Sequence, residues 1–111
     1  MQFDTFLWNH QNNHDKYWGY IFFNDVFYNF WGKRTSKKIN FKRFNKSTSM
    51  RKLTESVPSV LLTRKNDKMT DGYIDYTNNF DSIKEHFECF LNNFEYQLTL
   101  AKLTDKFHNE N

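Results

Sequence analysis

Two aromatic strand candidates separated by only two residues constrain the fold of this chain more than any other feature. Residues 17–23 and 26–33 are rich in aromatic and β-branched side chains, which suit the pleated surface of a sheet. Asn24 and Asp25 lie between them, and both residue types tolerate the positive φ angles of a two-residue turn. The pattern therefore predicts an antiparallel hairpin at the centre of the fold.

Two shorter segments extend this hairpin to a sheet of about four strands. Residues 3–8 form a first aromatic strand, and residues 38–44 form a last one in which apolar and polar side chains alternate. A helix is expected after Ser47 or Thr48, which are good N-cap residues, and Pro58 either interrupts it or restarts a second helix. Residues 66–72 are expected to form a loop, and residues 73–76 either add a strand or pack on the sheet.

The C-terminal part has the clearest helical pattern, over residues 79–108. Its apolar side chains recur at steps of three and four residues, and Ser82 and Glu85 have the spacing of a capping box. We therefore expect one α+β domain over residues 1–111, an antiparallel sheet with helices packed on one face. The apolar stripe consists of Ile83, Phe87, Phe90, Leu91, Phe94, Leu98 and Ala101.

The core of this domain is expected to consist largely of aromatic rings. The chain is only 38% hydrophobic, but it contains 13 Phe, 6 Tyr and 3 Trp, and each ring buries a large area. The single cysteine, Cys89, excludes an internal disulfide and fits an intracellular protein. No stretch has the length and apolarity of a signal peptide or a membrane span.

Positive charge is concentrated in one segment. Nine of the sixteen Lys and Arg residues lie between Lys33 and Lys52, and no Asp or Glu occurs from Val26 through Thr54. The rest of the chain has seven basic and thirteen acidic residues, a net charge of −6. Such a bipolar chain is expected to present one positive face to a polyanion.

Aromatic residues are interleaved with this basic segment, and cations beside exposed rings are typical of nucleic-acid binding. A basic hairpin over residues 33–43 is the expected centre of the surface. Lys42 and Arg43 must point to opposite faces of their strand, so at most one of them shares a surface with Lys38. The candidate nucleic-acid-binding residues are Trp31, Lys33, Arg34, Lys37, Lys38, Lys42, Arg43, Lys46, Arg51 and Lys52.

The order of motifs between residues 3 and 73 resembles the WGR domain, a small module of poly(ADP-ribose) polymerases that also occurs as a stand-alone protein. The segment Asp15-Lys16-Tyr17-Trp18 is similar to the family's Asn-Lys-Phe-Tyr, and Trp31-Gly32-Lys33 stands where the family has Trp-Gly-Arg. A basic strand, a helical stretch and Lys68 ahead of Gly72-Tyr73 follow in the family's order. The predicted helix over residues 79–108 lies outside the resemblance.

The resemblance implies DNA binding, with Trp31 against a sugar at a strand end and Lys33 on a phosphate. Lys33 departs from the family's Arg and lacks the planar fork that holds phosphate at two points. The Gly-containing turn that usually follows the signature is replaced by Arg34-Thr35-Ser36-Lys37. Pro58 is a further departure, within the helical stretch. DNA binding is therefore an expectation to be tested, with DNA ends as one candidate form of the ligand.

Other function classes have weaker support in the sequence. No phosphate-binding loop, nucleophile elbow or carboxylate pair is present, so we expect no enzyme and no cofactor. His10, His14, His86 and Cys89 have metal-like spacings but fall on a polar loop and near a helix stripe, so no metal is expected. RNA and an acidic host protein remain alternative partners to DNA, the latter if the chain is a viral or phage regulator. The C-terminal helix is a candidate homodimer surface.

Overall fold

The computed structural model describes residues 2–45 and 56–109, with side chains as far as Thr104. It confirms an α+β fold built on one antiparallel sheet. Its five strands are β1 (Thr5–Asn9), β2 (Lys16–Phe23), β3 (Val26–Lys33), β4 (Asn40–Asn45) and β5 (Ile74–Asp75), in the order β4-β3-β2-β1-β5. The helices are α1 (Val57–Thr70), two short 3₁₀ turns η1 (Phe80–Ser82) and η2 (Lys84–Phe87), and α2 (Glu88–Asn109).

The central hairpin forms as the sequence predicts. β2 and β3 pair along their whole lengths, from Lys16 opposite Lys33 to Phe23 opposite Val26. Asn24 and Asp25 make the two-residue turn with φ angles of 53° and 63°. Both angles lie in the left-handed region, which matches the right-handed twist of the flanking strands.

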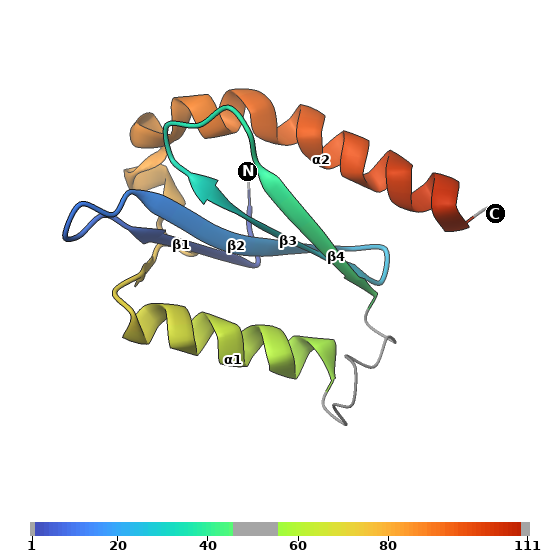
Figure 1. The fold of residues 1–111 in the computed structure, drawn as a ribbon, viewed down its shortest axis with the longest axis horizontal. Coiled ribbons are helices and arrows are strands. Elements are labelled where there is room, and N and C mark those ends of the chain that lie inside the picture. Colours follow the sequence, from blue (N-terminus) through green and yellow to red (C-terminus); the bar gives the residue numbers. More distant parts are fainter. Residues whose placement is uncertain (1, 46–55, 110–111) are drawn as a thin grey trace.

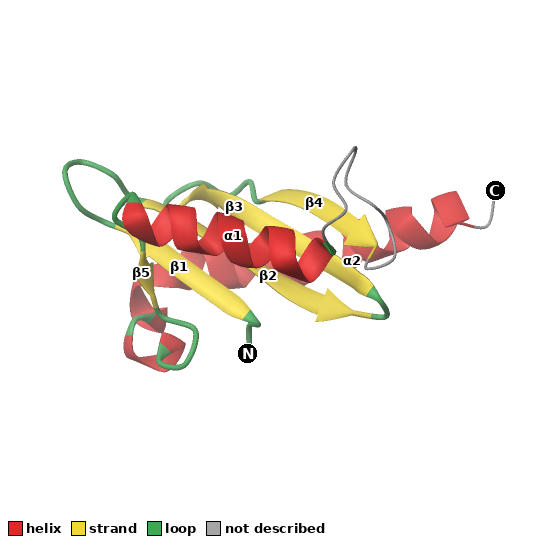
Figure 2. Cartoon of the chain, turned by 90° about the horizontal axis from the view of Figure 1, so that it is seen from below, coloured by secondary structure: helices red, strands yellow, loops and turns green. Residues whose placement is uncertain are grey.

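The two helices lie on opposite faces of the sheet (Figures 1 and 2). The prediction that helices pack on one face is therefore wrong. The strands are apolar on both sides: Phe6 and Phe30 point toward α2, while Leu7 and Trp18 point toward α1. Each face of the sheet therefore needs its own helix to bury its apolar side chains.

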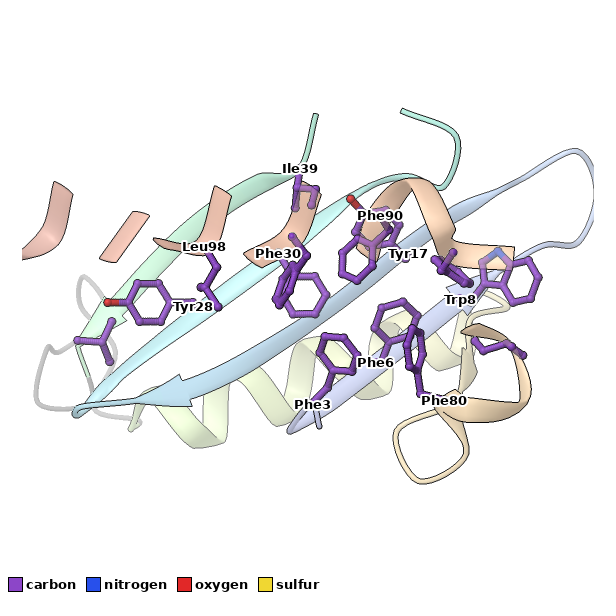
Figure 3. Packing of buried hydrophobic residues seen from close by; sticks show 14 residues of the cluster. Phe3, Phe6, Trp8, Tyr17, Tyr28, Phe30, Ile39, Phe80, Phe90 and Leu98 are labelled. Carbon is purple, nitrogen blue, oxygen red and sulfur yellow. The ribbon is translucent and has the colours of Figure 1, made fainter. Parts of the chain in front are cut away.

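The larger core lies between the sheet and α2, and it is made mainly of rings (Figure 3). Phe3 and Phe6 have ring centroids 5.0 Å apart, and those of Phe90 and Phe94 are 4.8 Å apart. These separations are typical of favourable tilted ring pairs. The expected aromatic core and the apolar stripe of the C-terminal helix are both present.

Helix α1 begins where Pro58 predicts a restart. Ser56 is its N-cap, and the backbone N–H of Ser59 donates to Ser56 Oγ at 3.3 Å. Pro58 lies in the first turn, where the missing N–H costs nothing. The expected caps Ser47 and Thr48 lie outside the described residues. The predicted loop over residues 66–72 is wrong, because the helix continues to Thr70, with Asn66 and Asp67 exposed.

The capping box proposed for the C-terminal helix is also wrong. Ser82 belongs to η1, and its Oγ donates to the carbonyl oxygen of Asn79 at 2.7 Å. Two 3₁₀ turns bury Phe80 and Phe87 before α2 begins at Glu88. The aromatic stripe thus starts in these turns rather than in a continuous helix. Among the described residues, no helix is long and apolar enough to cross a membrane.

Tyr17 on β2 brings an unpaired polar atom into the core under α2. Its side chain is almost fully buried, against Phe6, Phe30 and Phe90. The hydroxyl has no hydrogen-bond partner among the described residues. Burial, together with the nearby Cys89, raises the pKa of this hydroxyl far above the usual value for tyrosine.

Tyr17→Phe is expected to raise the free energy of unfolding by about 1 kcal/mol, because a buried hydroxyl without a partner costs about 1–3 kcal/mol. The wild type should also lose more stability than the variant above about pH 10, where the unfolded tyrosine ionises but the buried one stays neutral. Urea unfolding of both proteins near pH 7 and near pH 11 measures the two effects. A less stable variant near pH 7 would contradict the first.

Candidate nucleic-acid interface

A groove lies on the α1 face of the sheet, beside the helix. α1 packs on Leu7, Trp18 and Phe44. Figure 2 shows that β3 and β4 extend beyond the edge of the helix. Two adjoining hollows of about 330 and 320 Å³ share Trp31 and Lys68. We call them together the Trp31 groove. It is lined by Lys16, Trp18, Asn29, Trp31, Gly32, Lys33, Asn40, Lys42, Arg64, Lys68 and Tyr73.

Trp31 supplies the exposed ring of this groove. Its side chain is 37% exposed, whereas Trp8 and Trp18 are 8% and 4% exposed. The alternation of β3 explains the difference, because Phe30 takes the core side and Trp31 the opposite side. Trp31 pairs with Trp18 of β2 on one side and Asn40 of β4 on the other. One indole is therefore presented on the floor of a groove.

Two further aromatic rings hold four of the groove's cations in place. Lys42 Nζ lies 5.3 Å and Arg64 Cζ 5.4 Å from the ring centroid of Phe44. The corresponding distances from the ring of Tyr73 are 5.3 Å for Lys68 Nζ and 5.8 Å for Lys16 Nζ. These separations are within the range of cation–π attraction.

Lys33 is the fifth cation of the groove, at the end of β3 opposite Lys16. No Asp or Glu occurs among the described residues that line the two hollows. Five positive charges around one exposed indole form an anion-attracting site with an apolar surface at its centre.

Three of the ten predicted site residues line this groove: Trp31, Lys33 and Lys42. Lys37 and Lys38 are exposed on the β3–β4 connection, which is fastened to α2 instead. Gln97 Nε2 donates to the carbonyl oxygen of Lys37 at 2.8 Å, and Gln97 Oε1 accepts from the N–H of Ile39 at 2.8 Å. The described lining of the groove therefore includes Lys33 and Lys42 of the predicted basic hairpin but neither Lys37 nor Lys38.

Of the five remaining predicted residues, one lies on the other face of the sheet, three lie outside the described residues, and Arg34 pairs with Asp15. Arg43 points to the α2 face, where it lines a hollow with Tyr28 and Ala101. Lys42 and Arg43 thus lie on opposite faces, as strand alternation predicts. Lys46, Arg51 and Lys52 lie outside the described residues.

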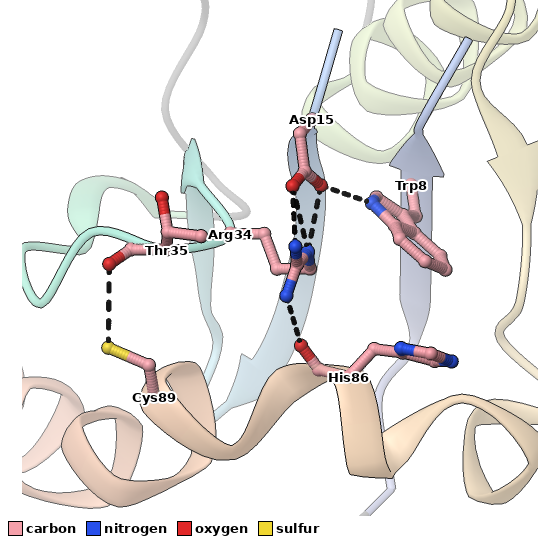
Figure 4. Close-up of polar contacts among 6 residues, drawn as sticks. All are labelled: Trp8, Asp15, Arg34, Thr35, His86 and Cys89. Atoms are coloured by element: carbon pink, nitrogen blue, oxygen red, sulfur yellow. Dashed lines mark hydrogen bonds and ion pairs between the residues drawn. The ribbon is translucent and has the colours of Figure 1, made fainter.

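Arg34 is engaged in holding the fold together (Figure 4). Its Nε donates to both carboxylate oxygens of Asp15 at 2.9 Å, and its Nη2 lies 2.8 Å from Asp15 Oδ2. Nη1 donates to the carbonyl oxygen of His86 at 2.9 Å, and Trp8 Nε1 donates to Asp15 at 2.9 Å. Burial raises the pKa of Asp15, but the hydrogen bonds from Arg34 and Trp8 and the Arg34 charge outweigh it and keep that pKa below its usual range.

Arg34→Ala is expected to lower the free energy of unfolding by about 1–2 kcal/mol, because it removes a forked ion pair and a bond to η2. A depressed carboxyl pKa stabilises the fold above about pH 4, and this contribution disappears as the pH falls through the folded-state pKa. The stability difference between wild type and variant should therefore shrink in acid. Urea unfolding between about pH 3 and pH 7 measures it, and a difference that grows in acid would contradict the assignment.

The groove residues outside the basic segment were not predicted to be binding residues. Arg64 and Lys68 are four residues apart and share one face of α1, but the expected loop at residues 66–72 concealed that spacing. Lys16 and Lys68 were named in the sequence only as part of the family resemblance, without a binding role. Asn29 and Asn40 lie on β3 and β4 with their side chains on the groove side, a position that alternation with Phe30 and Phe41 indicates.

The residues with metal-like spacing have other contacts. The His10 ring stacks on Trp8 with centroids 4.0 Å apart, and His10 Nε2 lies 3.2 Å from Tyr76 Oη. Cys89 Sγ lies 3.8 Å and 3.6 Å from the carbonyl oxygens of Thr35 and Ser36. Within residues 2–45 and 56–109, no three His, Cys, Asp or Glu side chains are grouped to hold a metal ion.

No protein-family model matches the chain, and no curated protein or solved structure matches it either. Some of the residues quoted for the resemblance lie close together in space. Lys16, the Trp31-Gly32-Lys33 segment, Lys68 and Tyr73 all line the same hollow of about 330 Å³. Residues that are up to 57 positions apart in the sequence therefore form one local environment.

Proposed function

We propose that the protein is a non-catalytic, intracellular DNA-binding module whose ligand occupies the Trp31 groove. The observation that carries this proposal is the set of five cations, with no acidic neighbour in the lining, around one exposed indole. The resemblance to the WGR domain makes DNA the nucleic acid of first choice. The phosphates would neutralise the cations while a sugar or base packs on Trp31.

This mode of binding carries little sequence preference. Specific readout of a base usually needs a bidentate Asn, Gln or Arg. Each asparagine in the groove has one amide N–H engaged: Asn29 Nδ2 donates to the Gly19 carbonyl at 2.7 Å and Asn40 Nδ2 to that of Trp31 at 3.2 Å. The Arg64 guanidinium lies 5.4 Å from the Phe44 ring centroid. Affinity is therefore expected to come from phosphate contacts and stacking.

Fluorescence-anisotropy titration of a labelled DNA duplex with the protein, repeated over a range of salt concentrations, tests the proposal. Contacts from all five groove cations predict a log–log slope of about −4.5, roughly −0.9 for each phosphate neutralised. A duplex with blocked ends serves as the comparison for end recognition. Absence of binding to any DNA at low salt would refute the proposed function.

RNA and an acidic protein are the competing partners for the same positive surface. Competition against labelled DNA by an RNA of equal length and by polyglutamate separates them, since polyglutamate offers charge without rings to stack. Displacement by polyglutamate at the same charge concentration as DNA would favour a protein partner. Stronger displacement by RNA would identify RNA as the partner.

A second candidate function, self-association, has its own observation. Tyr96, Leu100 and Leu103 are 68%, 45% and 56% exposed and lie at helical spacing along α2. Such a stripe is a candidate homodimer surface. Light scattering over a range of protein concentrations measures the mass, and a monomer throughout would exclude this candidate.

A further inference from the structure

The two groove cations that α1 contributes lie on its side toward the sheet rather than on its outer surface. Arg64 and Lys68 line the hollows and are only partly exposed. The exposed positions of α1 near them are uncharged or acidic, as at Leu62, Asp67 and Met69. A helix that enters the major groove of duplex DNA carries its contacts on the outward face. The outward face of α1 carries no such cationic contacts.

The groove is small. Residues of β2, β3 and β4 form its floor, and α1 forms one wall. Each hollow holds only about 320–330 Å³. This space suits a single sugar–phosphate strand with one base. It is too small for the two paired strands of a duplex, which would have to enter together.

Trp31 adds a requirement for an unstacked base. Its ring lies on this floor, between cations contributed by β2, β3, β4 and α1. A base inside a duplex has both of its flat faces covered by neighbouring bases. An unpaired base can turn one face to the indole, and such stacking is how sequence-tolerant single-strand proteins gain affinity.

We propose that the Trp31 groove binds an unpaired DNA strand, with one base stacked on Trp31. Phosphates on one side of that base contact Lys42 and Arg64, which Phe44 holds together. Phosphates on the other side contact Lys16 and Lys68, which Tyr73 holds together, and the neighbouring Lys33. This inference rests on the proposed function and specifies the form of DNA that the site accepts.

Three labelled ligands of equal length test it: an oligothymidine of about 12 nucleotides, a duplex, and an oligouridine, a length within the range that single-strand modules cover. The oligothymidine is expected to bind at least tenfold more tightly than the duplex, with a log–log salt slope of about −3.5, or roughly −0.7 per cation. Equal or tighter duplex binding would overturn this inference and leave the proposed function standing. Failure of every ligand to bind would overturn both, and tighter oligouridine binding would overturn the choice of DNA.

Variants at Trp31 give an independent readout. Trp31→Ala should weaken oligothymidine binding by about 5- to 150-fold, the value of one stacked base, while Trp31→Phe retains most of the affinity. Wild-type tryptophan fluorescence should be quenched by oligothymidine, and the quenching should be much smaller in Trp31→Phe because Trp8 and Trp18 are only 8% and 4% exposed. Equal thermal stability of the two variants confirms that both fold. A loss of less than twofold in a folded Trp31→Ala protein would overturn the stacking role.

Discussion

Lys42→Glu combined with Lys68→Glu is expected to weaken DNA binding by at least about 100-fold. The two lysines lie on β4 and α1 and line the same hollow beside Trp31. A hydrogen bond to a charged group contributes about 1.5–3 kcal/mol, so two lost phosphate contacts amount to about 3 kcal/mol or more. The new carboxylates add repulsion. Anisotropy at a fixed low salt concentration measures the loss.

The matched control reverses the same number of charges outside the groove. Lys37→Glu with Lys38→Glu alters the exposed connection that α2 holds, so it changes the long-range field but none of the groove contacts. Its effect should be at least tenfold smaller and should nearly vanish at high salt. Equal losses in the two double variants would show that net charge, rather than the groove, determines binding.

Gly19→Ala is expected to destabilise the fold by about 3 kcal/mol or more. A Cβ at position 19 would lie 2.3 Å from the carbonyl oxygen of Thr5 and 2.6 Å from Cζ of Phe30. The first contact is with backbone of the neighbouring strand, so relief requires β1 and β2 to move apart. Overpacking usually costs about 1–3 kcal/mol, and a backbone clash places this site at the upper end. Urea unfolding measures the change in the free energy of unfolding. The expected loss is a large part of the 5–15 kcal/mol by which folded proteins are usually stable.

Gly32 provides the comparison, because its obstacle is a removable side-chain atom. A Cβ at position 32 would lie 2.8 Å from Tyr17 Oη. Tyr17 Cζ, at 3.2 Å, would remain after Tyr17→Phe. Gly32→Ala should therefore be destabilising alone and partly rescued by Tyr17→Phe, whereas Gly19→Ala should not be rescued. A rescue of Gly19→Ala by the same change would show that its clash is not with the Thr5 backbone.

The strands were predictable because their signals are local. Alternating rings around Asn24 and Asp25 specify both the hairpin and its register, and the observed β3 has the predicted limits. The opposite placement of the helices was harder to infer. Leu7 and Trp18 could have been recognised as a second apolar face, but nothing local indicates which helix covers which face.

The predicted helix boundaries were wrong where polar residues were compatible with two local structures. Ser82 with Glu85 has the spacing of a capping box, yet the buried Phe80 and Phe87 hold that segment in 3₁₀ turns. Asn66 to Gly72 has the composition of a loop, yet a helix needs only one apolar face. Tertiary packing outweighed local preference in both cases.

The lining of the Trp31 groove was predictable only in part, because it draws on more than the basic segment. Trp31, Lys33 and Lys42 share the groove, while Arg34 is paired with Asp15 in the fold. The partners that complete the groove, Arg64 and Lys68, come from a helix packed across the sheet. Their role depends on that packing, which no spacing within the basic segment specifies.

The two-residue turn at Asn24 and Asp25 has a consequence for how such a chain can change over evolution. Phe30 and Trp31 are neighbours in β3, one inside the core and one on the groove floor. A single-residue insertion or deletion in the turn would exchange them, placing the indole in the interior and the phenyl ring outside. Viable length changes at this hairpin must therefore occur in pairs of residues, while substitutions at Trp31 remain free to alter what the groove accepts.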